Sequence, residues 1–346
     1  MAVVADFGVA KAVDLAAMRE DGAWTVRNGG MRVVKAGQVT SIATTNALEF
    51  DPVISPNGLD VAYVAGAPGS SHVLVRQLAG ERATALVKEF PGEQLRPAWS
   101  RDGSLVAFIT NGVAYSVPSS GGAPKVLVET PDFAISEVAL SPDGERIAFV
   151  NTTGLWIKPA GAGDAVQLLP GQTLHSIAWS PDGTRIAFID GIAAGLENMS
   201  AAPINVITIA GGKIAVIAKG DVVNLSPVWA PDGRSLFYTS NRQGTLDIYQ
   251  QFLTRDAQPR GLAQRITVGL SARRISLSKD GSHVAYDVVR SRSNIWTVDI
   301  GSGVASMTAA RQVTSDNQRI ESLSLSHDGQ WLAYDSDLGG NPISTR

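Results

Sequence analysis

The sequence predicts an all-β protein, a seven-bladed β-propeller of four-stranded blades, and three observations lead to this prediction. A turn motif related to Ser–Pro–Asp–Gly, in which every copy keeps Ser or Ala first, Asp or Asn third and Gly fourth, recurs seven times after an apolar residue in the 346 residues. Its copies begin 39 to 50 positions apart, which is the period of one four-stranded blade. Most copies are followed by an aliphatic residue, Ala and an aromatic residue, as in Ile147, Ala148 and Phe149. The 35 glycines and 17 prolines suit many short strands joined by tight turns.

The turn motif is predicted to connect the first two strands of each blade. Its Asp or Asn side chain can accept hydrogen bonds from turn N–H groups, and its Gly can adopt a positive φ. A calcium site at these Asp residues would need clustered ligands, which the motif does not supply. We therefore interpret the motif as structural. The seven copies are residues 54–58, 99–103, 140–144, 179–183, 229–233, 277–281 and 325–329.

The strand before each turn alternates large and small side chains. Residues one and three positions before the turn Ser or Ala are apolar in every copy, whereas the residue between them is small. Because successive side chains of a strand point to opposite faces, the large set should pack between blades. The small set should line the central channel, where the innermost strands converge. The small residues are Val53, Ala98, Ala139, Ala178, Val228, Ser276 and Ser324.

The two ends of the chain are expected to close the ring of blades. Trp24, Thr25 and Val26 repeat the pattern of residues 296–298, which belong to the third strand of the sixth repeat. The N-terminal segment is thus predicted to supply an outer strand pair, and residues 321–336 an inner pair that lacks outer strands of its own. Together they would form the last blade from strands of both termini and leave no exposed sheet edge.

Composition and charge narrow the class of protein. A formal net charge of −3 provides no basic surface for nucleic acid, and the longest apolar runs are strand-sized, so we expect neither nucleic-acid binding nor membrane insertion. Cysteine is absent, which excludes disulfides, thiolate nucleophiles and Cys-ligated zinc. The N-terminus lacks the features of a signal peptide. We expect a monomer, cytoplasmic if the chain is complete as given, and periplasmic or extracytoplasmic if it is a fragment of a membrane-anchored parent.

The turn at residues 179–183, the strand Ile186-Ala187-Phe188 that follows it, and residues 240–249 resemble the TolB-like β-propeller family, also described as WD40-like Pro-Asp repeats. The resemblance covers roughly residues 23–340. It implies a propeller that binds other proteins or peptides, usually outside the cytoplasm. The family also includes propeller domains of prolyl-oligopeptidase-like peptidases and propellers appended to bacterial signalling proteins.

A second resemblance lies at the N-terminus. Residues 4–11, which contain Asp6-Phe7-Gly8, look like the magnesium-binding DFG segment of bacterial serine/threonine protein kinases. A Gly-rich loop, an ATP-anchoring Lys, a His-Arg-Asp loop and an Ala-Pro-Glu motif are all missing. We therefore expect residues 1–20 to be a kinase-like remnant or a disordered tail in front of a propeller at residues 21–346, with no catalytic role for Asp6.

The position four residues before each turn Ser or Ala predicts a ring of polar side chains at the channel mouth. Acids, arginines and hydroxyls mix there, and this mixture could orient a peptide terminus or a polar ligand. The alternative is that these side chains pair with one another and with channel water. A long connection at residues 191–202 is a second candidate binding element. The binding candidates on and beside the ring are Asp51, Arg96, Glu137, His175, Ser176, Asn224, Ser226, Arg273, Arg274, Glu321 and Ser322.

These patterns favour a non-catalytic protein- or peptide-interaction or sensory module derived from a bacterial signalling kinase fusion. No Gly-x-Ser-x-Gly elbow is present, and the four histidines fall in four different repeats, so we expect no metal and no cofactor. The alternative is an enzyme, either a polysaccharide lyase or glycosidase that uses the channel mouth, or the detached propeller of a prolyl-oligopeptidase-like peptidase. The arginines in the predicted ring favour the first reading, because an acid/base pair needs uncompensated carboxyls.

Overall fold

A computed structural model describes residues 2–7, 17–18, 24–25, 32–35, 38–41, 48–67, 69–80, 82–87, 89–192, 200–288, 293–298, 310–315, 320, 322–336 and 343–345. Every regular element in these ranges is a β-strand, which confirms the all-β prediction. No helix long and apolar enough to cross a membrane occurs in the part of the chain so described. The chain divides into a larger unit, Ala12–Val289, and a smaller unit that combines Met1–Lys11 with Arg290–Arg346.

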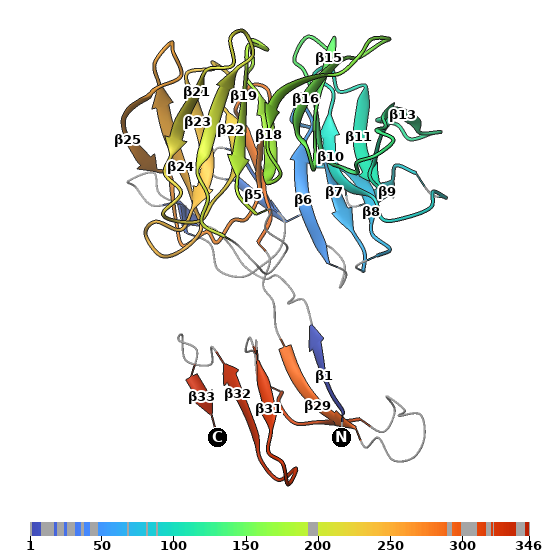
Figure 1. The fold of residues 1–346 in the computed structure, drawn as a ribbon, viewed down its shortest axis with the longest axis vertical. Helices are drawn as coiled ribbons and strands as arrows, with labels where there is room; N and C mark the ends of the chain where they lie inside the picture. Colours follow the sequence, from blue (N-terminus) through green and yellow to red (C-terminus); the bar gives the residue numbers. More distant parts are fainter. Residues whose placement is uncertain are drawn as a thin grey trace. The chain divides into compact units, whose positions relative to one another are not determined.

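The larger unit contains five propeller blades, each made of four consecutive antiparallel strands (Figure 1). In each blade the first and second strands are joined by the Ser–Pro–Asp–Gly-type turn, as predicted. The blades are β6–β9 (Glu49–Ile54, Asp60–Ala65, His72–Gln77, Ala83–Ala85), β10–β13 (Leu95–Trp99, Leu105–Thr110, Val113–Pro118, Lys125–Val128), β14–β17 (Ile135–Leu140, Arg146–Asn151, Gly154–Pro159, Val166–Pro170), β18–β21 (Leu174–Trp179, Arg185–Asp190, Ile204–Thr208, Ile214–Ala218) and β22–β25 (Asn224–Trp229, Ser235–Ser240, Asp247–Leu253, Pro259–Arg265).

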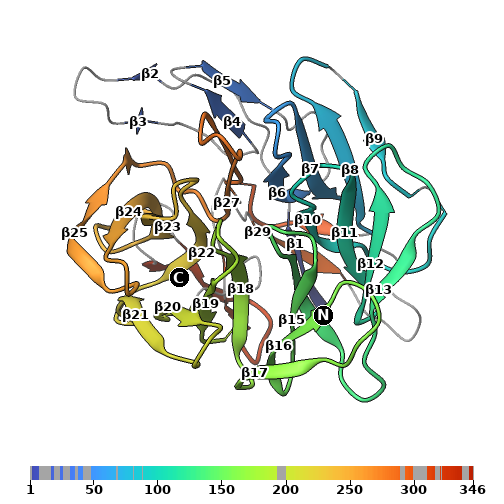
Figure 2. The ribbon, with the colours of Figure 1, turned by 90° about the horizontal axis from the view of Figure 1, so that it is seen from above.

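The prediction of seven blades is wrong, because the described residues form five complete blades of consecutive strands. A further four-stranded sheet combines β27 (Ile275–Leu277) and β28 (His283–Tyr286) with two N-terminal strands, β4 (Arg32–Lys35) and β5 (Gln38–Ser41). Strand β27 contacts both β22 and β6, so it lies between the fifth blade and the first (Figure 2). Six innermost strands therefore surround the central axis.

The closure by strands of both termini is also corrected. The N-terminal strands β4 and β5 do complete a later hairpin, but that hairpin is β27–β28 and not residues 321–336. Trp24 and Thr25, on which the prediction depended, pair instead with β2 (Ala17–Met18) and run parallel to β26 (Thr267–Val268). An outer strand is held to its neighbour by backbone hydrogen bonds, which form with any side chains. The side-chain pattern of the N-terminal segment therefore did not specify the hairpin with which its strands pair.

The smaller unit contains two three-stranded sheets. In one, β1 (Ala2–Phe7) pairs with β29 (Ser293–Val298), which pairs with β30 (Arg311–Gln312). The last copy of the turn motif lies in the other sheet, formed by β31 (Leu323–Leu325), β32 (Leu332–Ser336) and β33 (Ile343–Thr345). The seventh hairpin thus forms but takes its third strand from the C-terminal segment. The predicted boundary between residues 1–20 and 21–346 stays a prediction.

The Asp-Gly turns have the predicted geometry. In the second blade the Ser100 hydroxyl donates to Asp102 Oδ1 at 2.6 Å, and the Ser104 backbone N–H donates to the same oxygen at 3.1 Å. Gly103 has a φ of 75°, in the left-handed region that favours glycine. The hydroxyl bond from Ser100 and the bonds from Ser104 lower the pKa of Asp102 to about 2. These carboxylates therefore act as acceptors that fix the turn.

The core lies between neighbouring blades, as the alternation of large and small residues predicts. Ala107 and Ile109 of the second blade pack with Ile147 and Phe149 of the third. Tryptophans before the turns add polar links, because an indole N–H buried between blades needs an acceptor. The links are Trp99 Nε1 to Val53 O at 2.9 Å, Trp179 Nε1 to Ala139 O at 3.1 Å, and Trp229 Nε1 to Ala178 O at 3.1 Å.

Candidate functional site

An irregularity in the innermost strand positions the predicted ring of polar side chains. In four of the five blades the register between the first and second strands shifts at the ring position, and in the third blade it shifts one residue earlier, between Ile135 and Glu137. A β-bulge of this kind turns a side chain away from its regular direction. Four ring residues lie in the left-handed region, where residues other than glycine are uncommon. These are Asp51 (φ 54°), Arg96 (φ 56°), Ser176 (φ 54°) and Ser226 (φ 51°).

Asp51 of the first blade is the centre of a network of ion pairs that extends to the second blade and to the residues just before β27. Its Oδ1 accepts a hydrogen bond from Arg273 Nη2 at 2.9 Å and forms an ion pair with Arg274 Nε at 2.7 Å. Its Oδ2 accepts from Arg96 Nη1 at 3.3 Å. The Asp51 residue is only 5% exposed, so these charges attract one another in a medium that screens them less than bulk water does.

Two further carboxylates complete the network. Glu137 Oε1 lies 3.4 Å from Arg96 Nε and 3.8 Å from Arg274 Nη2. Asp287 is fully buried, accepts from Arg273 Nη2 at 3.2 Å and from the Arg274 backbone N–H at 2.7 Å, and is the acceptor for the Asp51 backbone N–H at 3.1 Å. Three arginines thus face three carboxylates. The pairing of these side chains with one another is the alternative that the sequence left open.

Burial sets the protonation behaviour of this network. Burial raises the pKa of Glu137 and of Asp287 above the ordinary values of their carboxyls, although Arg96 and Arg273, respectively, oppose the shift. Burial alone would lower the pKa of Arg96, but the carboxylates of Glu137 and Asp51 outweigh it and raise that pKa. Arg96 therefore stays charged, whereas desolvation makes the charged forms of Glu137 and Asp287 less favourable.

Sequence reasoning missed Asp287. The residue follows Tyr286 at the end of the second strand of its repeat, and Thr110, Asn151 and Ser240 end the second strands of other blades. All of these polar residues are buried. A recurrent polar residue at the end of an otherwise apolar strand was therefore the signal that could have found it.

A small cavity of about 10 Å³ adjoins the network. It has room for about one water molecule. His175 Nδ1 lies 3.0 Å from Ser176 Oγ, whereas His175 Nε2 and Arg273 Nε have no hydrogen-bond partner among the described residues. Burial, together with repulsion from Arg96, lowers the pKa of His175 to about 4, so its imidazole is neutral at pH 7. The cavity is lined by Arg96, His175, Ser176, Leu225, Ser226, Arg273 and Arg274.

The remaining predicted residues have structural contacts or lie elsewhere. Asn224 is buried, and its Nδ2 donates to Ala202 O at 2.9 Å and to Lys219 O at 2.8 Å. Ser226 Oγ accepts from the Ile275 backbone N–H at 2.9 Å and so joins the fifth blade to β27. Ser322 belongs to the smaller unit, is exposed, and donates its backbone N–H to Asp335 Oδ1 at 2.7 Å. Glu321 and residues 193–199 of the long connection lie outside the described residues.

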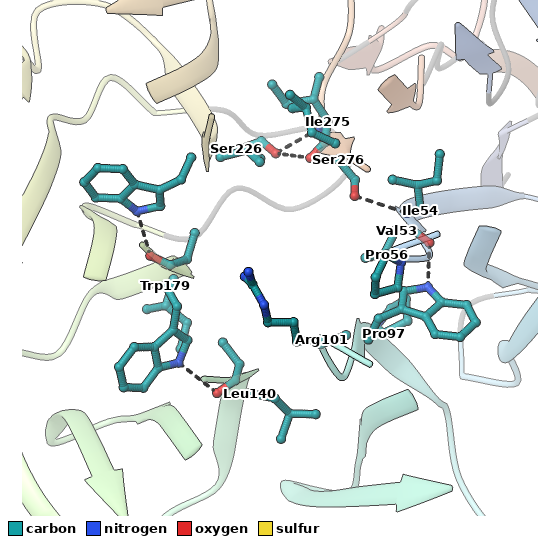
Figure 3. A pocket seen from close by; sticks show the side chains of 18 of the residues that line it. Val53, Ile54, Pro56, Pro97, Arg101, Leu140, Trp179, Ser226, Ile275 and Ser276 are labelled. Carbon is teal, nitrogen blue, oxygen red and sulfur yellow. Dashed lines mark hydrogen bonds between the residues drawn. The ribbon is translucent and has the colours of Figure 1, made fainter. Parts of the chain in front are cut away.

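A cavity of about 370 Å³ runs along the inner strands (Figure 3). Ring residues line one end of it, and turn residues line the other. Its walls include six of the seven predicted small residues, together with large residues on either side of them, whereas Ser324 lies in β31 of the smaller unit. The small wall residues are Val53, Ala98, Ala139, Ala178, Val228 and Ser276, and the turn residues are Pro56, Ser100, Arg101, Pro142, Pro181, Pro231, Ser278 and Lys279.

The cavity lining carries an excess of positive charge. Its cationic residues are Arg96, Arg101, Arg274 and Lys279, and its acidic residues are Asp51 and Glu137, so four cations face two acids and the formal excess is two. Arg96 and Arg274 are ion-paired with those two acids. Across the described ranges, no group of three or more His, Cys, Asp or Glu residues is placed to hold a metal ion.

Blades of consecutive antiparallel strands, a hairpin completed by N-terminal strands and a cavity on the axis define a β-propeller. This chain belongs to the TolB β-propeller domain family, which it matches over residues 117–344. The β-propeller domain of lipoprotein LpqB matches residues 29–169. These matches confirm the TolB-like resemblance that the repeats indicated.

Two curated bacterial proteins are similar to parts of this chain. The TolB homolog of Chlorobium chlorochromatii is 28% identical over 116 residues, which are 33% of this chain and 26% of that protein. The uncharacterized peptidase YuxL of Bacillus subtilis is 24% identical over 226 residues, which are 62% of this chain and 32% of that protein. The chain therefore spans about a third or less of the length of these relatives.

Two solved structures share the fold. TolB from Acinetobacter baumannii aligns with a TM-score of 0.51 and 17% identity, over 76% of this chain and 65% of that chain. An oligogalacturonate lyase in complex with manganese aligns with a TM-score of 0.54 and 14% identity, over 92% of this chain and 97% of that chain. At such low identities the likeness shows the propeller fold alone.

Proposed function

We propose that this chain is a non-catalytic interaction module that binds a protein or peptide segment in its central cavity. One observation carries the proposal. The cavity of about 370 Å³ has mostly apolar walls of small, aliphatic, proline and tryptophan side chains, and the two carboxylates that face it are ion-paired with arginines. Such a cavity has room for an extended segment and offers few groups free to exchange protons.

The ion pairs argue against acid/base chemistry at the ring. A general acid or base must exchange a proton with its substrate, so its carboxyl has to be within reach and free of competing donors. Asp51 accepts hydrogen bonds from Arg96 and Arg273 and is ion-paired with Arg274, and Glu137 lies beside two of the same arginines. We therefore assign the predicted ring arginines to the architecture of the channel end, and the binding surface to the walls and the opposite end.

Selection from a library of random linear peptides tests this proposal. Peptides are enriched on the wild-type chain and then measured against Ala139→Leu, which adds a larger side chain to the cavity wall. Ala160→Leu is the matched control, because Ala160 is exposed and does not line the cavity. We expect selected peptides to lose affinity for Ala139→Leu and to keep it for Ala160→Leu. Because Ala139 packs against a core cluster, the affinities are compared at a temperature well below the melting temperature of each variant. Equal affinity for all three proteins would refute cavity binding.

One sequence alignment supports the alternative that the chain is part of an enzyme. The Bacillus peptidase aligns with 62% of this chain, and the aligned segment is 32% of that protein. In this alternative the chain is the propeller of a longer peptidase, and its cavity admits substrate to a hydrolase domain. Incubation of the chain with oligogalacturonate and manganese tests the lyase version directly, since formation of an unsaturated product would show catalysis.

The origin of the chain and its compartment also belong to this proposal. The resemblance of residues 4–11 to a kinase DFG segment supports derivation from a bacterial signalling kinase fusion, and it stays a prediction. Asp6 and Phe7 end strand β1, where they pair with Asn294 and Ser293. A sensory propeller outside the cytoplasm fits both the family resemblance and a membrane-anchored parent.

A further inference from the structure

Two cations replace proline at one side of the cavity end formed by the turns. The residue after the turn Ser or Ala is proline in four of the six copies that line the cavity, but Arg101 and Lys279 occupy it in the other two. Strands β10 and β27, which lead into these two turns, both contact β6. The Lys279 backbone N–H donates to Pro56 O at 3.3 Å. Arg101 and Lys279 therefore flank the turn of the first blade.

These two charges are available to a ligand. Both residues are exposed, and neither forms an ion pair within the described parts of the chain. Figure 3 shows the Arg101 side chain extending into the middle of the cavity. The neighbouring Asp102 and Asp280 carboxylates accept hydrogen bonds from hydroxyls of their own turns. These bonds lower the pKa of both carboxyls, so Asp102 and Asp280 stay ionised, but neither residue lines the cavity, whereas Arg101 and Lys279 do.

We propose that the cavity takes an acidic, extended peptide segment whose carboxylates pair with Arg101 and Lys279. This inference rests on the proposed function and adds the charge and the direction of the bound segment. The segment enters from the turn end, because the other end is occupied by the ion-paired ring of Asp51, Arg96 and Arg274. The formal excess of two positive charges in the lining matches a segment with two or more carboxylates.

The cavity walls favour a peptide over an acidic saccharide. A sugar ring presents many hydroxyls and often stacks on an exposed aromatic face, whereas most wall side chains are aliphatic or proline. Three tryptophans also line the cavity, and of these Trp99 is half-buried and donates its Nε1 to Val53 O. Trp179 is buried, and the Arg146 guanidinium lies 5.0 Å from the centre of its ring. Trp229 is buried as well. Small apolar side chains of a peptide can pack on such walls while its carboxylates reach the cations.

Each cation should contribute in its own way. The planar guanidinium of Arg101 can hold a carboxylate through two parallel hydrogen bonds, whereas the ammonium of Lys279 acts as a point charge. Both lie at the solvent end of the cavity, where dissolved salt screens them. Affinity should therefore fall as ionic strength rises.

A binding titration with defined peptides tests the inference. The probe is a fluorescein-labelled peptide of alternating Gly and Glu, and its neutral counterpart alternates Gly and Gln. Arg101→Pro restores the residue common in the motif, Lys279→Gln removes the second charge, and Arg234→Gln is the matched control. Arg234 is an exposed cation one residue after the turn glycine of the fifth blade and does not line the cavity. Oligogalacturonate serves as the saccharide polyanion.

The expected result is saturable binding of the Glu peptide and at least tenfold weaker binding of the Gln peptide. Arg101→Pro and Lys279→Gln should each weaken the Glu peptide roughly tenfold, as expected for loss of a hydrogen bond between charged groups, and Arg234→Gln should change nothing. Equal affinity for both peptides, no saturable binding, or insensitivity to both cavity variants would overturn the inference. Binding of oligogalacturonate without the Glu peptide would overturn it in favour of a saccharide.

Failure of this inference and failure of the proposed function are distinguishable. If library peptides lose affinity for Ala139→Leu but are not acidic and ignore Arg101→Pro, cavity binding holds and the charge selectivity is wrong. If no peptide of either kind distinguishes Ala139→Leu from the wild type, the proposed function itself is wrong.

Discussion

Replacing Asp51 with Asn tests the ion-pair network that joins the first, second and third blades to β27. Asparagine keeps the size of the side chain and tolerates the left-handed backbone that Asp51 adopts at φ 54°. It also keeps the backbone N–H that donates to Asp287 Oδ2 at 3.1 Å. The substitution therefore removes one negative charge from between three arginines and changes little else.

The expected loss is about 3 kcal/mol of unfolding free energy. Removing one partner of a buried ion pair costs about 3–5 kcal/mol, because the other charge is left without compensation. The Arg273 side chain is 8% exposed but keeps Asp287 at 3.2 Å. The Arg96 and Arg274 side chains are 22% and 21% exposed, so water partly solvates them after the substitution. These two facts place the expected loss at the lower end of the range.

Urea unfolding measures this loss as a change in midpoint at constant slope. Asp256→Asn is the control, since Asp256 is exposed and forms no ion pair among the described residues, and it should change stability by no more than about 0.5 kcal/mol. Glu137→Gln should cost less than Asp51→Asn, because burial raises the pKa of Glu137 and so opposes its charged form. A loss for Asp51→Asn as small as that for Asp256→Asn would refute the reasoning.

Three further predictions follow from the fold and the ring. Deleting residues 1–41 removes β4 and β5 and leaves the edge of β28 unpaired, so it should lower the melting temperature by roughly 5 °C and promote association. Deleting residues 1–31 keeps both strands and should have a smaller effect. Equal melting temperatures for the two deletions would contradict the pairing of β4 with β28. Calorimetric titration with Mg-ATP should show no binding, and saturable heat that Asp6→Ala abolishes would contradict this expectation. The pKa of His175 is lowered from 6.5 in the unfolded chain to about 4, so the unfolded state binds the extra proton and the wild type should lose up to about 3 kcal/mol of stability as pH falls from 6.5 to 4. His175→Gln should lack this loss, and the difference between the two proteins isolates it from Glu137 and Asp287, whose raised pKa values act in the opposite direction; parallel pH profiles would show that His175 is not the titrating group.

The elements that the sequence predicted well are those whose cause is local. The Asp-Gly turns depend on a carboxylate, a hydroxyl and a glycine within five residues, and they form as predicted. The small wall residues follow from the alternation of a single strand, and Ala98, Ala139 and Ala178 do line the cavity. The repeat period and the turn residues together were sufficient to predict the four-stranded blade.

The elements that the sequence predicted poorly depend on contacts between distant segments. Seven hairpin motifs indicated seven blades. An outer strand is held by backbone hydrogen bonds, which do not depend on side-chain identity, so the sequence did not show that β4 pairs with β28. The ring residues were found by position, yet their pairing was not, because Asp51 meets Arg273 across 222 positions of sequence. Arg101 and Lys279 were passed over since each was treated as a minor variant of a structural turn.

A crystal structure of the complex with a library-selected peptide would show whether the central cavity is the binding site. We expect peptide density in the cavity between Ala98, Ala139 and Ala178, with carboxylates next to Arg101 and Lys279. Density on the outer strands of the blades, with an empty cavity, would contradict it.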